Sequence, residues 1–167
     1  MTSQPGRKFS LLLVLLTASL AAAKGQEDLV LKSSQLVIPG VLVTAHGDER
    51  ELVGQVSRLT LTATPAIKPD GFSEIKVNHD AGSELEGSLL SVRQNFTGRH
   101  GKWPMGILFE YGFEHTGRPI DGASTGLAMA VLLEGLFTEW KGNSNVCMTG
   151  AITPAGRTVP VRGIIPN

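Results

Sequence analysis

Residues 121–140 read DGASTGLAMAVLLEGLFTEW and decide how the C-terminal half of the chain folds. They open with a polar, glycine-rich hexapeptide and continue as a run of Leu, Ala, Met, Val and Phe. This pattern predicts a loop that leads into a largely buried helix over residues 124–140. Ser124 then lies at the start of the helix, near the positive end of its dipole and near backbone N–H groups without helical partners.

A serine in this position has two interpretations. The neighbouring N–H groups can hold an oxyanion, which makes Ser124 a candidate nucleophile. Alternatively, Ser124 or Asp121 is only an N-cap of the helix, and the hexapeptide taken alone favours this simpler explanation. The decision depends on the rest of the chain.

The other elements follow from alternation, helical spacing and turn residues. Strands are predicted on either side of a Pro39-Gly40 turn and over 54–64, 72–78 and 107–111, with a short amphipathic helix over 82–96. The strands before this helix are expected to form an antiparallel sheet. Two more strands, 146–149 and 157–161, are predicted to form a hairpin through a turn at 154–156. The order of elements predicts an α+β fold.

Two motifs after the apolar helix favour the interpretation of Ser124 as a nucleophile. Residues 148–152 read MTGAI and residues 156–164 read GRTVPVRGI. With the serine segment, they resemble the proteolytic domain of Lon-type proteases, which shows DGPSAG-like, MTGEI-like and GxVLPVGG-like motifs in this order. The resemblance covers residues 107–164, and residues 41–96 fit the family's preceding sheet and helix in outline. It implies the two-layer α/β sandwich also seen in a small-subunit ribosomal protein.

The resemblance also implies a Ser/Lys dyad, in which a buried lysine of lowered pKa takes the serine's proton. Ser124 matches the nucleophile. Thr149 matches a threonine that orients the amine, and Asp121 matches the acidic residue of the serine segment, so both receive supporting roles. Two simpler explanations stay open: Thr149 is an ordinary strand residue, and Asp121 braces its own turn.

The chain departs from the family pattern at several positions. Ala123, Thr125, Ala151 and Arg162 replace the usual proline, alanine, glutamate and glycine. The departure with most consequence is Asn167, the last residue, which aligns with the catalytic lysine although an amide cannot act as a base.

Two interpretations of Asn167 stay open. A shift of one residue would place the lysine just past it, in a longer chain whose further strand and helix cover apolar faces of the domain. Alternatively, Asn167 truly replaces the lysine. Under the first interpretation, residues 35–167 form a Lon-like fold whose C-terminal part is missing.

The N-terminus predicts export. A short polar start, an apolar run and Ala21-Ala22-Ala23 make residues 1–23 a secretory signal peptide, because the apolar run is shorter than the ~20 residues of a membrane span. A polar lead-in over 24–34 and a Lon-like domain over 35–167 follow. We expect a secreted or periplasmic protein with no membrane attachment after cleavage.

Several function classes are disfavoured by composition. The four histidines have no metal-ligand spacing, the formal net charge is zero, and no phosphate-binding loop is present. We therefore expect no metal, other cofactor, nucleic acid or ATP. The single cysteine, Cys147, forms no intrachain disulfide and is expected to be a buried apolar filler.

Other candidates for the site are weaker. His115 is the histidine nearest in sequence to Ser124 and is expected to be a solvated loop residue. Lys102 and Lys141 each flank a glycine and make poor bases. Trp103 and residues 109–111 are interpreted either as the lining of a substrate groove or as packing residues.

The sequence thus predicts an exported, ATP-independent serine endopeptidase that cuts polypeptide through Ser124. The rival interpretation is a catalytically silent Lon-like domain for peptide binding or assembly. The family's rings make a homo-oligomer a candidate assembly, although the sequence establishes none.

Overall fold

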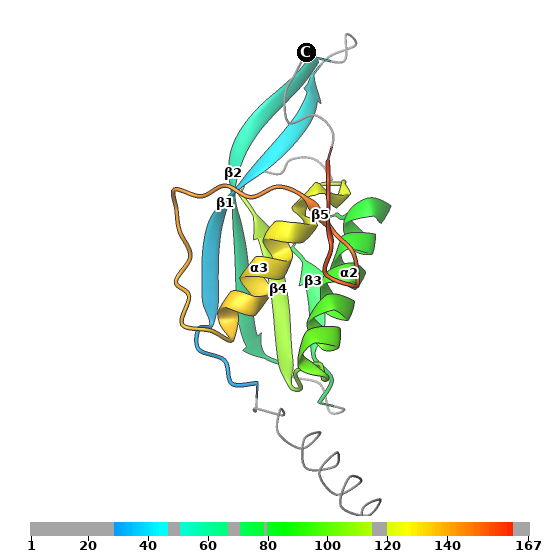
Figure 1. The fold of residues 1–167 in the computed structure, drawn as a ribbon. Coiled ribbons are helices and arrows are strands. Elements are labelled where there is room, and N and C mark those ends of the chain that lie inside the picture. The colour runs from blue at the N-terminus through cyan, green and yellow to red at the C-terminus, as the bar shows by residue number, and fades with distance from the viewer. Residues whose placement is uncertain (1–28, 47–50, 67–70, 79, 115–119, 162–167) are drawn as a thin grey trace, which may run out of the picture.

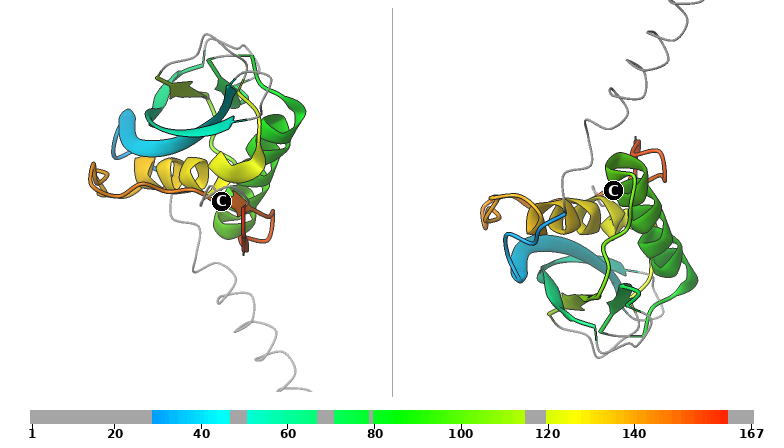
Figure 2. Two further views of the ribbon diagram at one scale, coloured as in Figure 1. Left: turned by 90° about the horizontal axis from the view of Figure 1, so that it is seen from above. Right: turned by 90° about the horizontal axis from the view of Figure 1, so that it is seen from below.

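The computed structural model of the chain has two layers, a sheet and a pair of helices that cover one face of it (Figures 1 and 2). The helices are α2 (Ser83–His100) and α3 (Gly126–Leu136). The α+β class predicted from the sequence is confirmed. The structure describes residues 29–46, 51–66, 71–78, 80–114 and 120–161.

The sheet has four strands in the order β1-β2-β4-β3. Its members are β1 (Gln35–His46), β2 (Glu51–Pro65), β3 (Glu74–Val77) and β4 (Ile107–Phe113). Strands β1, β2 and β4 pair antiparallel, but β3 pairs only with β4 and in parallel, so the prediction of an antiparallel partner for the 72–78 strand is wrong. The reason is that α2 connects β3 to β4, and a helical crossover returns the chain in the same direction.

The predicted turn at Pro39-Gly40 is also absent, because β1 runs through both residues without a break. Pro39 lies opposite Arg58 in the ladder with β2. Since β1 is the first strand of the sheet order, a residue without an N–H is tolerated there. Gly40 also forms an isolated parallel bridge with Met148, so a later segment lies along the outer edge of β1.

Helix α2 is longer than predicted, because Gly98 lies inside it instead of ending it. Acidic side chains occupy its first turn and basic ones its last turn, which complements the helix dipole. The helix ends at Gly101, whose φ of 71° is a left-handed conformation that glycine adopts without strain.

Helix α3 is shorter than predicted. It is preceded by the 3₁₀ turn η1 (Ala123–Thr125) and ends at Leu136, although apolar residues continue to Trp140. The carbonyl of Leu136 accepts hydrogen bonds from the N–H groups of Lys32 (2.7 Å) and Ser33 (3.2 Å), so the lead-in to β1 satisfies this helix end.

The C-terminal hairpin consists of β5 (Ala151–Ile152) and β6 (Thr158–Val159), and its turn lies at residues 154–156 as predicted. The first strand begins later than expected, because within 146–149 only Met148 forms a bridge. Cys147 is exposed, so the prediction of a buried filler is wrong.

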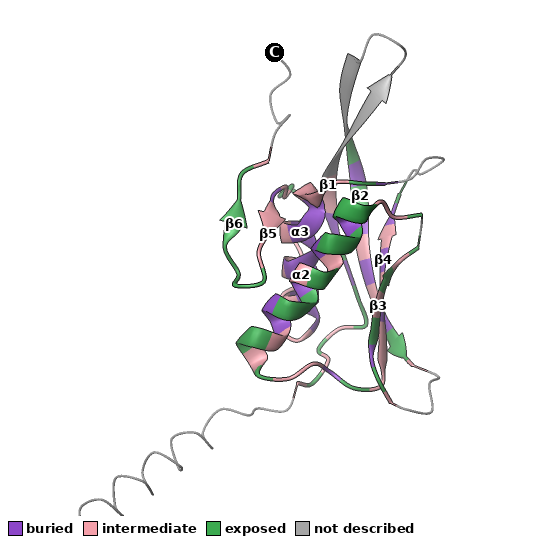
Figure 3. Cartoon of the chain, turned by 90° about the vertical axis from the view of Figure 1, so that its right-hand side faces the viewer, coloured by how far each residue is buried: buried purple, intermediate pink, exposed green. Residues whose placement is uncertain are grey.

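The core lies between the sheet and the helices (Figure 3). Phe109 and Tyr111 of β4 are fully buried in it, so they are packing residues and do not line a substrate groove. The hydroxyl of Tyr111 donates to the carbonyl of Met129 in α3 at 2.5 Å. Burial raises the pKa of Tyr111 well above its usual value, which keeps the phenol neutral. The sheet and α3 are therefore fixed relative to each other by apolar packing and a buried hydrogen bond.

Candidate active site

Ser124 is half-buried in η1, immediately before α3. The chain enters this turn through Gly122, whose φ of 113° and ψ of 140° are accessible essentially only to glycine. A Cβ added to Gly122 would lie 3.9 Å from the Oγ of Ser124, so the serine side chain is directed back toward that glycine. No residue in the described part of the chain hydrogen-bonds this hydroxyl. The serine is presented by its backbone and keeps its hydroxyl unengaged.

The backbone of Ser124 is fixed by the segment before β5. Its carbonyl accepts the N–H of Gly150 at 2.6 Å and the hydroxyl of Thr149 at 3.3 Å. One turn into α3, the N–H of Leu127 donates to the carbonyl of Gly150 at 2.8 Å. Ser124 and Thr149 are thus brought together, but the contact of Thr149 is with the serine's carbonyl.

The side chain of Asp121 is directed toward the start of α2. Its Oδ1 accepts the N–H groups of Glu84 (3.0 Å), Leu85 (3.1 Å) and its own neighbour Gly122 (2.9 Å). These bonds, the one from Gly122 first, lower the pKa of Asp121. The bond from Gly122 agrees with the interpretation that Asp121 braces its own turn. The bonds from Glu84 and Leu85 show in addition that the carboxylate caps α2, which is not the helix it precedes.

Glycines complete the site, and the sequence interpretation gave them no role. At Gly82 an added Cβ would fall 2.1 Å from the Cγ of Asp121, so the capping carboxylate occupies the space of a side chain. Gly126 lies close to Ile152 and Ser88, and Gly150 has a φ of 153° beside Leu127. The only signal in the sequence was the recurrence of glycine beside the motif residues.

The described lysines do not reach Ser124. Lys102 follows α2 at the end opposite the Asp121 cap, about 27 Å away at 1.5 Å per helical residue. Lys141 follows the C-terminal end of α3, and Lys32 contacts that same end through its backbone. Lys76 is on β3 and pairs with Glu110 at 2.8 Å. Any base for Ser124 must come from outside this set.

Some of the predicted site lies beyond the described residues. Asn167 and His115 are in this group, so their relation to Ser124 is not part of the site as seen here. The described residues include no cluster of His, Cys, Asp and Glu suited to a metal ion. They also include no helix with the length and apolar character of a membrane span.

Comparison with known proteins agrees with the motifs around Ser124. Residues 113–166 match the family model of the Lon protease (S16) C-terminal proteolytic domain. No curated protein matches the chain. The matched stretch contains Asp121, Ser124 and Thr149, together with η1, α3 and the β5–β6 hairpin. The resemblance to a Lon-type proteolytic domain is therefore confirmed for residues 113–166, and this part of the chain is similar to a family of serine peptidases.

Proposed function

We propose that the protein is an exported, ATP-independent Lon-like serine endopeptidase with Ser124 as its nucleophile. The observation that carries the proposal is the presentation of Ser124: a half-buried serine with an unengaged hydroxyl at the start of a helix, inside the stretch that matches the family. Export is supported by the signal-like residues 1–23, and ATP independence by the lack of a phosphate-binding motif in the sequence.

In the proposed reaction, the Oγ of Ser124 attacks a peptide carbonyl carbon while its proton passes to a base. The first N–H groups of a helix have no intrahelical partner, so those of Ala123 and Ser124 are suitable donors to the oxyanion that forms. The C–N bond then breaks, the leaving amine takes the proton, and water hydrolyses the acyl-serine. Thr149 and Asp121 act as supports that hold the serine segment, through the hydrogen bonds described above.

The base in this proposal is a lysine at the position aligned with Asn167 or directly beside it. Support comes from the family match, which runs to residue 166, and from the distance of the described lysines. Sequencing the C-terminal peptide of the protein from its natural source tests this part. A lysine at or next to position 167 supports the dyad, and a mature chain that ends at Asn167 contradicts it.

The distance between the described lysines and Ser124 also favours a second candidate function, a catalytically silent domain that binds peptide or contributes to assembly. The two candidates differ in the reactivity of Ser124. A fluorophosphonate probe followed by peptide mapping should label Ser124 in the natural full-length protein if the serine is activated. Ser124→Ala should remove the label, whereas Ser83→Ala, a change at an exposed serine at the start of α2, should leave it intact. Absence of labelling at Ser124 would favour the silent domain.

A further inference from the structure

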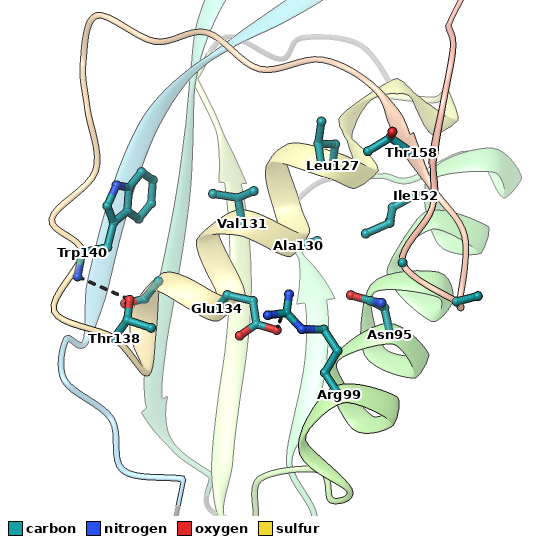
Figure 4. A pocket seen from close by; sticks show the side chains of 13 residues that line it. Asn95, Arg99, Leu127, Ala130, Val131, Glu134, Thr138, Trp140, Ile152 and Thr158 are labelled. Carbon is teal, nitrogen blue, oxygen red and sulfur yellow. Dashed lines mark hydrogen bonds and ion pairs between the residues drawn. The ribbon is translucent and has the colours of Figure 1, made fainter.

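A groove of about 590 Å³ runs along the side of α3 that faces away from the sheet (Figure 4). It is open to solvent and bordered by α3, by α2 and by the β5–β6 hairpin, and it extends to the residues that follow α3. Its apolar lining consists of Leu127, Ala130, Val131, Trp140, Ile152 and Ala155. Leu127 lies one helical turn beyond Ser124, so one end of the groove adjoins the serine segment. The volume is typical of a ligand site.

One polar side chain in this groove lacks a partner. Asn95 of α2 is only 6% exposed, and it makes no hydrogen bond to any residue that the structure describes. Its Nδ2 lies against the hairpin turn, where a Cβ added to Gly156 would approach within 2.6 Å, and Figure 4 shows the carboxamide directed into the groove. The polar atoms of this carboxamide are accessible from the groove and have no partner among the described residues, so they are available to hydrogen-bond a group that binds there.

The charges of the groove limit what that group is. The charged residues among its lining, Arg99 and Glu134, pair with each other at 3.3 Å, and Glu134 also pairs with His100 at 2.9 Å. The site therefore matches an uncharged occupant. A carboxamide offers an acceptor and donors side by side, which complements a peptide group. The part of α3 beside the groove is about 15 Å long, the length of four or five extended residues.

We propose that the groove binds an uncharged, extended segment of the polypeptide substrate, with Asn95 hydrogen-bonded to one of its peptide groups. The inference rests on the proposed function, because the substrate's cleaved bond is taken to lie at Ser124. According to this inference, the protein also selects substrates by residues several positions away from the cleaved bond. Asp, Glu, Lys and Arg are disfavoured at those positions.

Binding can be measured without cleavage. The full chain carrying Ser124→Ala is titrated with acetyl-Ala-Val-Ala-Val-Ala-amide while the fluorescence of Trp140 is followed. The same titration of a protein that also carries Trp140→Phe shows whether Trp140 is the source of the fluorescence change. We expect saturable binding that weakens about tenfold when the peptide is shortened to acetyl-Ala-Val-amide or when aspartate or lysine replaces its valines. Lack of any saturable change overturns the proposal and leaves Asn95 with solvent only.

Asn95→Leu, which keeps the branching of the side chain and removes its polar atoms, is the deciding variant. It should retain the melting temperature, because the amide makes no hydrogen bond to the described residues, while peptide affinity falls about tenfold. Gln94→Leu makes the same replacement at the exposed neighbouring position and should leave affinity unchanged. Equal affinity in the Asn95→Leu and parent proteins overturns the inference.

The outcomes separate this inference from the proposed function. Peptide binding that depends on Asn95, in a protein whose Ser124 is unreactive, supports the groove and contradicts the peptidase. Cleavage by the wild-type protein that is independent of both peptide length and Asn95 supports the peptidase and contradicts the groove.

Discussion

The two ends of α3 are held by different kinds of contact. At the N-terminal end, backbone groups of Ser124 and Leu127 bond to Gly150, and the side chain of the serine takes no part. At the C-terminal end, side-chain contacts are added to the backbone bonds that Leu136 accepts: Phe137 packs on Phe96 with ring centroids 5.2 Å apart, and Glu134 pairs with His100. A helix fixed in this way has a rigid body and one end whose hydroxyl remains available for chemistry.

This comparison predicts that the two ends respond differently to mutation. Changes at the C-terminal end should lower the free energy of unfolding and leave the reactivity of Ser124 in the folded protein unchanged. Changes at the N-terminal end should alter that reactivity as well. The predictions below test this division with denaturant unfolding and with the rate of fluorophosphonate labelling.

Phe96→Ala should have the largest effect on stability. Phe96 is 1% exposed and contacts His100, Trp103 and Phe137, so its truncation should cost about 3–5 kcal/mol. Leu90→Ala on the same helix is the control, because Leu90 is 56% exposed. The labelling rate per folded molecule should stay at the wild-type value, and a large decrease in that rate would contradict the division between the two ends.

Gly122→Ala should have the next largest effect. A side chain at a φ of 113° introduces strain of about 1–3 kcal/mol, and relief of this strain must displace the neighbouring Ser124. We expect labelling of the folded protein to slow at least tenfold. Gly87→Ala, at a helical position with open space around it, should be neutral or stabilising. Normal labelling of Gly122→Ala would show that the backbone conformation at this glycine does not position the serine.

Asp121 should make the free energy of unfolding depend on pH in the acidic range. Its pKa is lowered in the folded protein, so its contribution is fully present above the unfolded value of about 3.9 and disappears as the pH falls through the lower folded value. Asp121→Asn keeps an acceptor oxygen without the charge. The stability difference between wild type and Asp121→Asn should therefore shrink as urea unfolding is repeated from pH 7 down to pH 3. A difference that is constant over this range would exclude a charged cap.

Arg99→Ala should have the smallest effect. The side chain of Arg99 is 62% exposed, and Glu134 keeps its contact with His100 when the arginine is removed. Exposed ion pairs are usually worth about 0–1 kcal/mol, so the change in unfolding free energy should be about 0.5 kcal/mol or less. A loss above about 2 kcal/mol would mean that Arg99 holds the two helices together.

Local sequence patterns predicted much of the fold and missed features that depend on distant contacts. Alternation and helical spacing located β2, β4, α2 and α3. They could not show that α3 ends at Leu136, because the groups that cap it, Lys32 and Ser33, come from the beginning of the domain. The direction of β3 is equally invisible to a pattern of alternating residues, since it depends on the path of the chain through α2.

The candidate site shows the same limit. The start of a helix at Ser124 was predicted because that setting is local, a loop that becomes a helix, whereas its interpretation as a nucleophile required the two later motifs and their resemblance to the Lon-type domain. The contacts of Asp121 with Glu84 and Leu85 were missed, because they join segments 36 or 37 residues apart. Gly82 belongs to the site for the same reason: only the folded chain shows that the Asp121 carboxylate fills the space beside it.

The uninterrupted β1 has a consequence for behaviour at high concentration. An outer strand with unpaired backbone groups is a template for aggregation with other molecules. In β1, Pro39 removes one donor, Gly40 bridges to Met148, and Gly142 lies close to the carbonyl of Val37. The chain thus shields this border of the sheet with its own later residues, which reduces the tendency of separate molecules to join through it into fibrils.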